Sequence, residues 1–112
     1  MDITFEQLPS GAIVIVLKGR MDVTGAMKID VQFAAVAAAN RAVVVDLGAV
    51  EFLASMGLRT LIMAAKSMHT KKGRMALWRP QPMVEEVLVT SGTTTLIPLA
   101  HDMSAAERWA LS

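Results

Sequence analysis

The chain of 112 residues contains no cysteine, and aromatic residues make up only 4% of it. The absence of cysteine excludes a disulfide framework, a thiolate zinc site and a thiol nucleophile, and it agrees with a reducing, cytoplasmic environment. The scarcity of aromatic residues disfavours the base-stacking surfaces of single-strand nucleic-acid binders. A formal net charge of +1 adds no general attraction to nucleic acids. We therefore expect no nucleic-acid partner.

Long apolar runs are also absent, although hydrophobic residues make up 54% of the chain. The longest runs, such as residues 12–17 and 42–45, are far shorter than the roughly 20 residues of a membrane-spanning helix. Asp2 and Glu6 stand where a signal peptide would carry basic residues. These features predict a cytoplasmic protein without direct membrane insertion, and the length predicts one domain over residues 1–112.

Motifs for catalysis or cofactor binding are missing as well. The chain has no P-loop and no Gly-x-Gly-x-x-Gly after a strand, and neither His69 nor His101 has a metal-ligating partner four residues away. Ser55, His101 and Asp46 could form a Ser-His-Asp triad on paper, but the Gly-x-Ser-x-Gly turn that exposes such a serine is absent. We therefore predict a protein that is not an enzyme and has no metal site and no cofactor.

The alternation of strand-like and helix-like segments predicts a single α/β domain. Residues 1–8 and 12–17 are expected to form an antiparallel hairpin, because Pro9, Ser10 and Gly11 make a turn between them. Strands are further expected at 42–47, 74–78 and 96–99, and helices at 22–40, 55–73, 83–90 and 104–111. This order favours a mixed, mostly parallel sheet of four or five strands with about four helices.

The spacing of apolar residues predicts which side of each helix is buried. Four residues of the first helix are expected to face the core, namely Met27, Val31, Ala34 and Ala38, after a cap at Asp22. The inner face of the second helix is expected to carry Leu58, Leu61, Ile62 and Ala65. Among the methionines, Met63 and Met75 are also placed in the core, whereas Met21 and Met56 are placed at the surface. The basic residues from Lys66 to Arg74 are interpreted as a solvated helix end, where cations complement the helix dipole.

Ser55 follows a strand and a predicted loop at residues 48–54, and it stands at the expected start of the second helix. There its hydroxyl could cap the helix, a contribution of about 1 kcal/mol. Gly57 is a poor residue for a helix interior, so its expected use is the close approach of another group. The apolar neighbours Phe52, Leu53, Ala54, Met56 and Leu58 predict a docking face around the hydroxyl.

Two motifs, one within residues 43–58 and one at residues 17–22, resemble the STAS domain, the fold of bacterial anti-sigma-factor antagonists. Residues 43–47 read VVVDL and residues 50–58 read VEFLASMGL, which is similar to the family pattern of a strand ending in Asp-Leu, a hydrophobic pair and Asp-Ser-Ser/Thr-Gly-Leu at a helix start. Residues 17–22, LKGRMD, resemble the family's turn between the second strand and the first helix. The order of elements matches over essentially the whole chain.

The resemblance implies a non-enzymatic regulator of transcription that works by partner switching. Such proteins bind an anti-sigma factor, often a serine kinase, which phosphorylates them, and a phosphatase reverses the modification. Ser55 corresponds to the phospho-acceptor, and Asp22 to the turn aspartate. We expect a monomer or weak dimer. The expected partner-binding residues are Arg20, Asp22, Leu53, Ala54, Met56, Gly57 and Arg59.

Two positions depart from the family pattern, because Ala54 replaces the aspartate before the acceptor and Met56 replaces the second hydroxyl residue. Both changes make the face more apolar. One alternative is therefore an accessory STAS subunit of a membrane lipid-transport ATPase complex, with Ser55 serving only as a cap. Another is a STAS module that senses a nucleotide or small ligand in a pocket near Asp22 and the loop 48–54.

Overall fold

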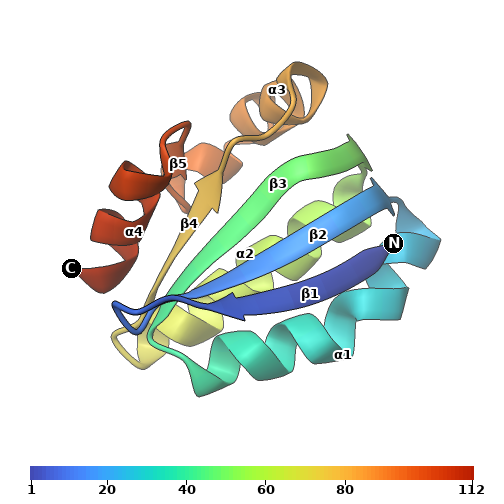
Figure 1. Ribbon diagram of the computed structural model, residues 1–112. Helices are drawn as coiled ribbons and strands as arrows, with labels where there is room; N and C mark the ends of the chain where they lie inside the picture. Colours follow the sequence, from blue (N-terminus) through green and yellow to red (C-terminus); the bar gives the residue numbers. More distant parts are fainter.

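Five strands form one mixed sheet in the computed structural model, which describes residues 1–112 (Figure 1). The elements are β1 Asp2–Gln7, β2 Ile13–Met21, α1 Val23–Ala39, β3 Ala42–Leu53, α2 Ser55–Thr70, β4 Arg74–Trp78, α3 Pro82–Thr90, the 3₁₀ turn η1 Thr93–Thr95, β5 Leu99–Ala100 and α4 Met103–Leu111. The hairpin β1–β2 is antiparallel and the other pairs are parallel. The predicted α/β fold, with its N-terminal hairpin and four helices, is confirmed.

The strand order in the sheet is the order in the sequence, β1-β2-β3-β4-β5. The hairpin turn is closed by a hydrogen bond from the Leu8 N–H to the Ala12 carbonyl at 2.8 Å, and Gly11 within it has a positive φ of 98°. Each later strand reaches its neighbour through a helix, which is the connection that parallel pairing requires. Every strand therefore lies beside the strand that precedes it in the chain.

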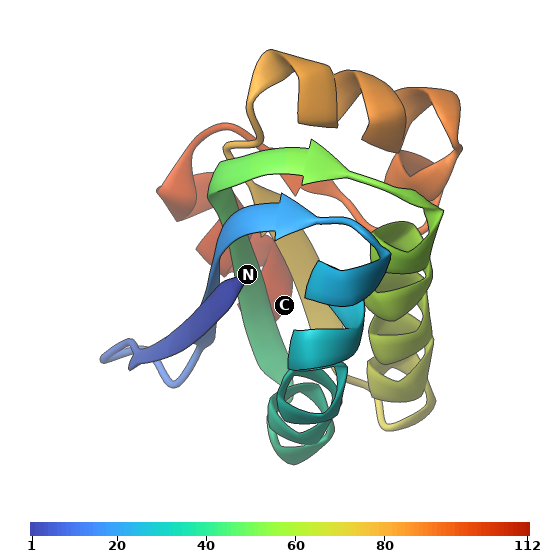
Figure 2. The same ribbon diagram turned by 90° about the vertical axis from the view of Figure 1, so that its right-hand side faces the viewer.

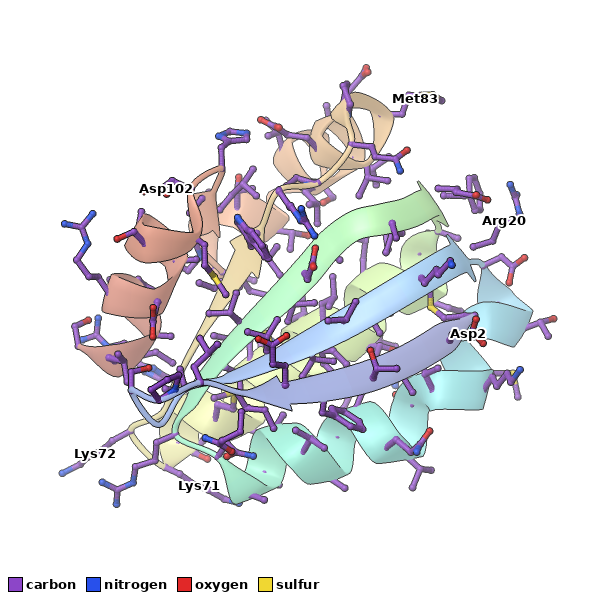
Figure 3. All side chains as sticks on the ribbon, viewed as in Figure 1. Asp2, Arg20, Lys71, Lys72, Met83 and Asp102 are labelled. Atoms are coloured by element: carbon purple, nitrogen blue, oxygen red, sulfur yellow. The ribbon has the colours of Figure 1, made fainter.

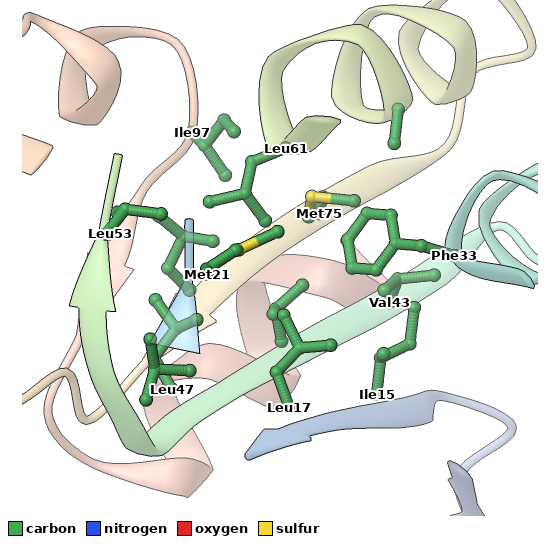
Figure 4. Close-up of a cluster of buried hydrophobic side chains, with 14 of the residues drawn as sticks. Ile15, Leu17, Met21, Phe33, Val43, Leu47, Leu53, Leu61, Met75 and Ile97 are labelled. Atoms are coloured by element: carbon green, nitrogen blue, oxygen red, sulfur yellow. The ribbon is translucent and has the colours of Figure 1, made fainter. Parts of the chain in front are cut away.

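The two faces of the sheet are covered unequally (Figure 2). Helices α1 and α2 cover one face over a core of 20 buried residues, and Phe33 and Leu61 extend from these helices onto the sheet (Figure 4). Helix α4 covers the other face over a cluster of only 7 buried residues, which includes Ala106 and Ala110. Small side chains on α4 let it lie close to the strands, whereas the large core lies under α1 and α2.

The buried face of α1 was predicted wrongly, because the buried residues lie one or two positions before the predicted ones. Met27 and Val31 are 66% and 79% exposed, Ala34 and Ala38 are exposed as well, and the buried residues are Gly25, Ala26, Ile29, Phe33 and Ala37. The helical period was predicted correctly, but its rotation was not. Asp22 caps the helix as predicted, and Gly25 packs so tightly against the Arg20 carbonyl that it fixes which side of α1 faces the sheet.

Three methionines lie elsewhere than predicted. Met63 is 56% exposed and Met27 is 66% exposed, whereas Met21 is fully buried at the end of β2. Met75 is buried and Met56 is 37% exposed, as predicted. On α2 the inner face is confirmed, since Leu61 is buried and its three expected companions pack against the large core.

Some element boundaries also differ from the prediction. Strand β3 does not end near residue 47 but continues to Leu53, because it pairs with β2 as far as Met21. Residues 48–53 of the expected loop 48–54 are therefore part of β3. The last strand lies at Leu99–Ala100 instead of 96–99, and α4 is capped by Asp102 rather than Ser104.

Candidate functional site

Two strand-to-helix corners meet at one end of the sheet. Strands β2 and β3 end side by side, with Met21 opposite Leu53, and the Ala54 N–H donates to the Met21 carbonyl at 3.0 Å. The β2–α1 corner comprises residues 20–25 and the β3–α2 corner comprises residues 52–57. Parallel pairing thus brings together residues that are more than thirty positions apart in the sequence.

At the β3–α2 corner, Ser55 is the first residue of α2 and is exposed to solvent. The predicted cap is wrong: the N-cap position belongs to Ala54, and no side chain accepts a hydrogen bond there. The helix begins at Ser55, as expected, and Ser55 is its first residue rather than its cap, because the Ala54 carbonyl already accepts from the Leu58 N–H at 3.1 Å. The first N–H groups of α2 are therefore left without a side-chain acceptor.

The β2–α1 corner is closed by side chains. The Asp22 carboxylate accepts a hydrogen bond from the Gly25 N–H at 2.8 Å, and the Arg20 guanidinium lies 3.9 Å from the other Asp22 oxygen. The same guanidinium stacks 4.4 Å from the centre of the Phe52 ring. Arg20, labelled in Figure 3, thus connects the two corners.

Most of the predicted partner-binding residues gather here, but not all are at the surface. Arg20, Met56 and Arg59 are exposed and Asp22 and Ala54 are half-buried, while Phe52 is 39% exposed beside them. Two of the predicted residues, Leu53 and Gly57, are buried. We call the exposed set Arg20, Phe52, Ser55, Met56 and Arg59 the Ser55 face.

Gly57 fills the predicted role of permitting a close approach. A Cβ atom at this position would lie 2.7 Å from both a Leu53 methyl carbon and the Met21 Cγ. The glycine therefore lets α2 settle onto the ends of β2 and β3. Leu53 and Gly57 support the Ser55 face from below and do not line it.

The Ser55 face continues into a groove of about 570 Å³ between α1 and α2. Met56 and Arg59 line both, and Met27, Val31 and Met63 lie further along the groove. These last three residues were predicted to be buried. The groove was not predictable from the sequence, because two apolar stripes run along α1 and only contact with the sheet decides which of them is buried.

The residues of the hypothetical triad are separated. Asp46 is 5% exposed and accepts hydrogen bonds from two Arg79 nitrogens and from the Gly48 N–H, each at 2.9 Å. Burial raises the pKa of the Asp46 carboxyl, but the hydrogen bonds and charge of Arg79 and the Gly48 N–H outweigh it, so the pKa lies below its usual value. His101 instead contacts Glu85 at 2.8 Å. Asp46 is thus an ionised structural residue that joins β3 to the end of β4.

The sequence profile of the STAS domain matches residues 5–106. The chain belongs to the STAS domain family. A Bordetella bronchiseptica protein named as an anti-sigma factor antagonist, BtrV, is 31% identical over 107 residues, which cover 95% of this chain and 91% of that protein. The family resemblance inferred from the two motifs is therefore confirmed.

Solved structures of the family have the same fold. An anti-sigma factor antagonist from Mycobacterium paratuberculosis superposes with a TM-score of 0.88 at 25% identity, over 99% of this chain and 94% of that one. The Bacillus cell fate determinant SpoIIAA in its phosphorylated form superposes with a TM-score of 0.71 at 20% identity, over 96% of this chain and 98% of that one.

These comparisons make this STAS protein a homologue of the anti-sigma factor antagonists. Such antagonists are non-enzymatic regulators, so the prediction of a protein that is not an enzyme is confirmed. None of its helices combines the length and the apolar character needed to cross a membrane.

Proposed function

We propose that the protein binds an anti-sigma factor, or a similar serine kinase, through the Ser55 face, and that phosphorylation of Ser55 releases the partner. The observation that carries the proposal is the exposed Ser55 hydroxyl between two exposed apolar side chains, Phe52 and Met56. The name of the Bordetella relative, an anti-sigma factor antagonist, supports the class of partner.

The composition of the Ser55 face suits a protein interface. Aromatic, methionine and arginine side chains are enriched in such interfaces, and this face combines Phe52 and Met56 with Arg20 and Arg59. Stacking on Phe52 restrains the Arg20 guanidinium before any partner arrives, which lowers the entropy lost on binding. Ser55 lies between these residues and would be covered by a docked partner.

A phosphate on Ser55 would be compatible with the fold and incompatible with docking. In the transfer, the serine oxygen forms a bond to the γ-phosphorus of ATP, ADP leaves, and the serine proton passes to a base of the kinase. Helix N-termini stabilise anions, and the first N–H groups of α2 have no side-chain acceptor. The added charge of about −1.5 to −2 would have to be desolvated against Phe52 and Met56 in the complex. Hydrolysis of the phosphate ester by a phosphatase would restore the docking face.

Intact-mass measurement after incubation with the cognate anti-sigma factor kinase and ATP tests the switch. We expect one added phosphate on the native protein and none on Ser55→Ala. Calorimetry should show that Ser55→Ala still binds the partner, whereas Ser55→Asp binds it roughly 100-fold more weakly. No added phosphate, together with unchanged binding by Ser55→Asp, would overturn the switch.

The second candidate is an accessory subunit of a membrane lipid-transport ATPase complex, in permanent contact through the same face. It is favoured by Ala54 and Met56, which place apolar groups on both sides of Ser55. In that case Ser55→Ala should leave assembly unchanged and Met56→Asp should abolish it. Copurification with a permease and an ATPase, and not with a kinase, would favour this candidate over the first.

A further inference from the structure

A second hollow, of about 490 Å³, lies at the other end of α2. It is bordered by the last turns of α2, the start of β4, the segment after η1 and the last turn of α4. Since α2 rises about 1.5 Å per residue over 16 residues, this hollow is remote from the Ser55 face. Lys71 and Lys72 mark this end of the molecule in Figure 3, opposite Arg20. We call it the α2–α4 pocket.

We infer that the α2–α4 pocket binds an aliphatic carboxylate, with the carboxylate on Arg74 and the chain against Leu96 and Trp109. The volume of the pocket falls within the usual range of small-molecule sites, about 300–1,000 Å³. The inference does not depend on the Ser55 face or on any protein partner.

The charged part of the lining has one sign only. Two cations, Lys66 and Arg74, line the pocket, and no aspartate or glutamate does. The sequence contains no acidic residue between Glu51 and Glu85, and the ion pairs of the chain all lie elsewhere. The pocket therefore offers positive charge that the protein itself does not neutralise.

The helix dipole does not account for all of this charge. Cations are favoured at a helix C-terminus, which explains Lys66 near the end of α2. Arg74, however, belongs to β4, and its N–H donates to the Arg41 carbonyl at 2.8 Å, which fixes its backbone. A cation from a different element needs another explanation, and an anionic ligand provides one.

Arg74 is already oriented for a carboxylate. Its guanidinium lies 4.3 Å from the centre of the Trp109 ring. Stacking occupies the face of the guanidinium and leaves its in-plane N–H groups available, and these bind carboxylates through two parallel hydrogen bonds. The stacked pair thus forms a fixed anion-binding group at the edge of the pocket.

The remainder of the lining is apolar and includes side chains that would otherwise face water. Leu96 is 59% exposed and Trp109 is 41% exposed, and Ile62 and Met75 complete the apolar wall. An inorganic anion would leave Leu96 and Trp109 uncovered, and a neutral hydrocarbon would leave Arg74 without a counter-charge. A carboxylate with an aliphatic chain satisfies both parts of the lining.

Fluorescence of Trp109 provides a direct test with octanoate as the probe. The chain has two tryptophans, so Trp78→Phe leaves Trp109 as the single emitter. We expect a saturable change on titration with octanoate, and no saturable change with acetate, which lacks the chain, or with octanol, which lacks the charge. If Trp78→Phe does not fold, the indole N–H signal of Trp109 in the NMR spectrum of the native protein gives the same readout.

Two charge-removing variants complete the test. Arg74→Met should weaken octanoate binding by roughly tenfold, because it removes the charge-assisted hydrogen bonds. Arg108→Met is the matched control: Arg108 is the exposed neighbour of Trp109 on α4 but does not line the pocket, so binding should not change. The inference is overturned if octanoate gives no saturable signal, if octanol binds as well, or if both variants weaken binding equally. Binding of anionic phospholipid vesicles without binding of octanoate would likewise overturn the inference, because the basic residues would then serve a membrane surface and not a ligand pocket.

Discussion

The two strand-to-helix corners begin in the same way and are completed differently. In both, the third residue of the helix is a glycine, in the sequences DVTG at residues 22–25 and ASMG at residues 54–57. The β2–α1 corner is closed by the Asp22 cap, whereas at the β3–α2 corner Ala54 provides no acceptor and Ser55 points to solvent. The protein's own side chain thus completes the β2–α1 corner, whereas the first N–H groups of α2 have no side-chain acceptor.

The largest effect is expected from Gly25→Ala. The new Cβ would lie 2.1 Å from the Arg20 carbonyl oxygen, a backbone atom that cannot move without displacing β2. We expect a loss of about 3 kcal/mol in the free energy of unfolding, measured in urea. Gly57→Ala is the matched variant, since its Cβ would meet only side-chain atoms of Leu53 and Met21, at 2.7 Å. Gly57→Ala should cost clearly less, and equal losses would contradict the difference between the corners.

Asp22→Ala should have the next largest effect. It removes the acceptor of the Gly25 N–H and opens the first corner, so the free energy of unfolding should fall by about 1 kcal/mol. Asp22→Asn, which keeps an acceptor oxygen, should restore most of this loss in the same urea titration. If Asp22→Ala were neutral, the cap would not be what distinguishes the two corners.

Ala54→Asp should close the second corner. An aspartate at the N-cap can accept from the free N–H groups of α2, and we expect the free energy of unfolding to rise by about 0.5–1 kcal/mol. Ala54→Asn separates the hydrogen bond from the charge, because it can cap without adding an anion. A loss of stability in both variants would show that the backbone at Ala54 cannot present a capping side chain.

Ser55→Ala should have the smallest effect on stability. Because Ser55 occupies the first helical position and not the cap, thermal and urea unfolding should change by less than about 0.5 kcal/mol. A loss of about 1 kcal/mol would instead show that the hydroxyl caps α2. If Ser55→Ala leaves the free energy of unfolding unchanged, this variant is also a sound reference for the phosphorylation experiment, since any change in partner binding would come from the loss of the hydroxyl itself.

The order of the elements was predictable because turns and caps are local. Pro9 to Gly11 mark the hairpin, Asp22 marks the start of α1, and the strand residues 74–78 were predicted with the boundaries that β4 has. The rotation of α1 was not predictable, because Ile29 and Val31 are equally apolar and only contact with the sheet decides between their stripes. Similarly, Gly48 suggested the end of a strand, but β3 continues past it to Leu53 because it remains paired with β2.

The candidate site was predictable as a place but not in its geometry. The position of Ser55 at the start of a helix followed from the motif. The missing cap did not, because it depends on whether the first helical hydrogen bond is accepted by the carbonyl of Ala54 or of Ser55. Contacts between distant segments were not predictable at all. The stacking of Arg20 on Phe52 and of Arg74 on Trp109 joins residues that only the folded sheet brings together.

The sequential order of the strands has a consequence for how the protein is made. Strands β1 and β2 leave the ribosome first, so both strands of the hairpin are outside it before β3 emerges. Each later strand then emerges next to an edge that is already present, after a connection that contains a single helix or, before β5, a helix and one short turn. Each new pairing closes over one connection only, which keeps its entropy cost small. We therefore expect this domain to grow by extension during synthesis, with α4 covering the second face of the sheet last.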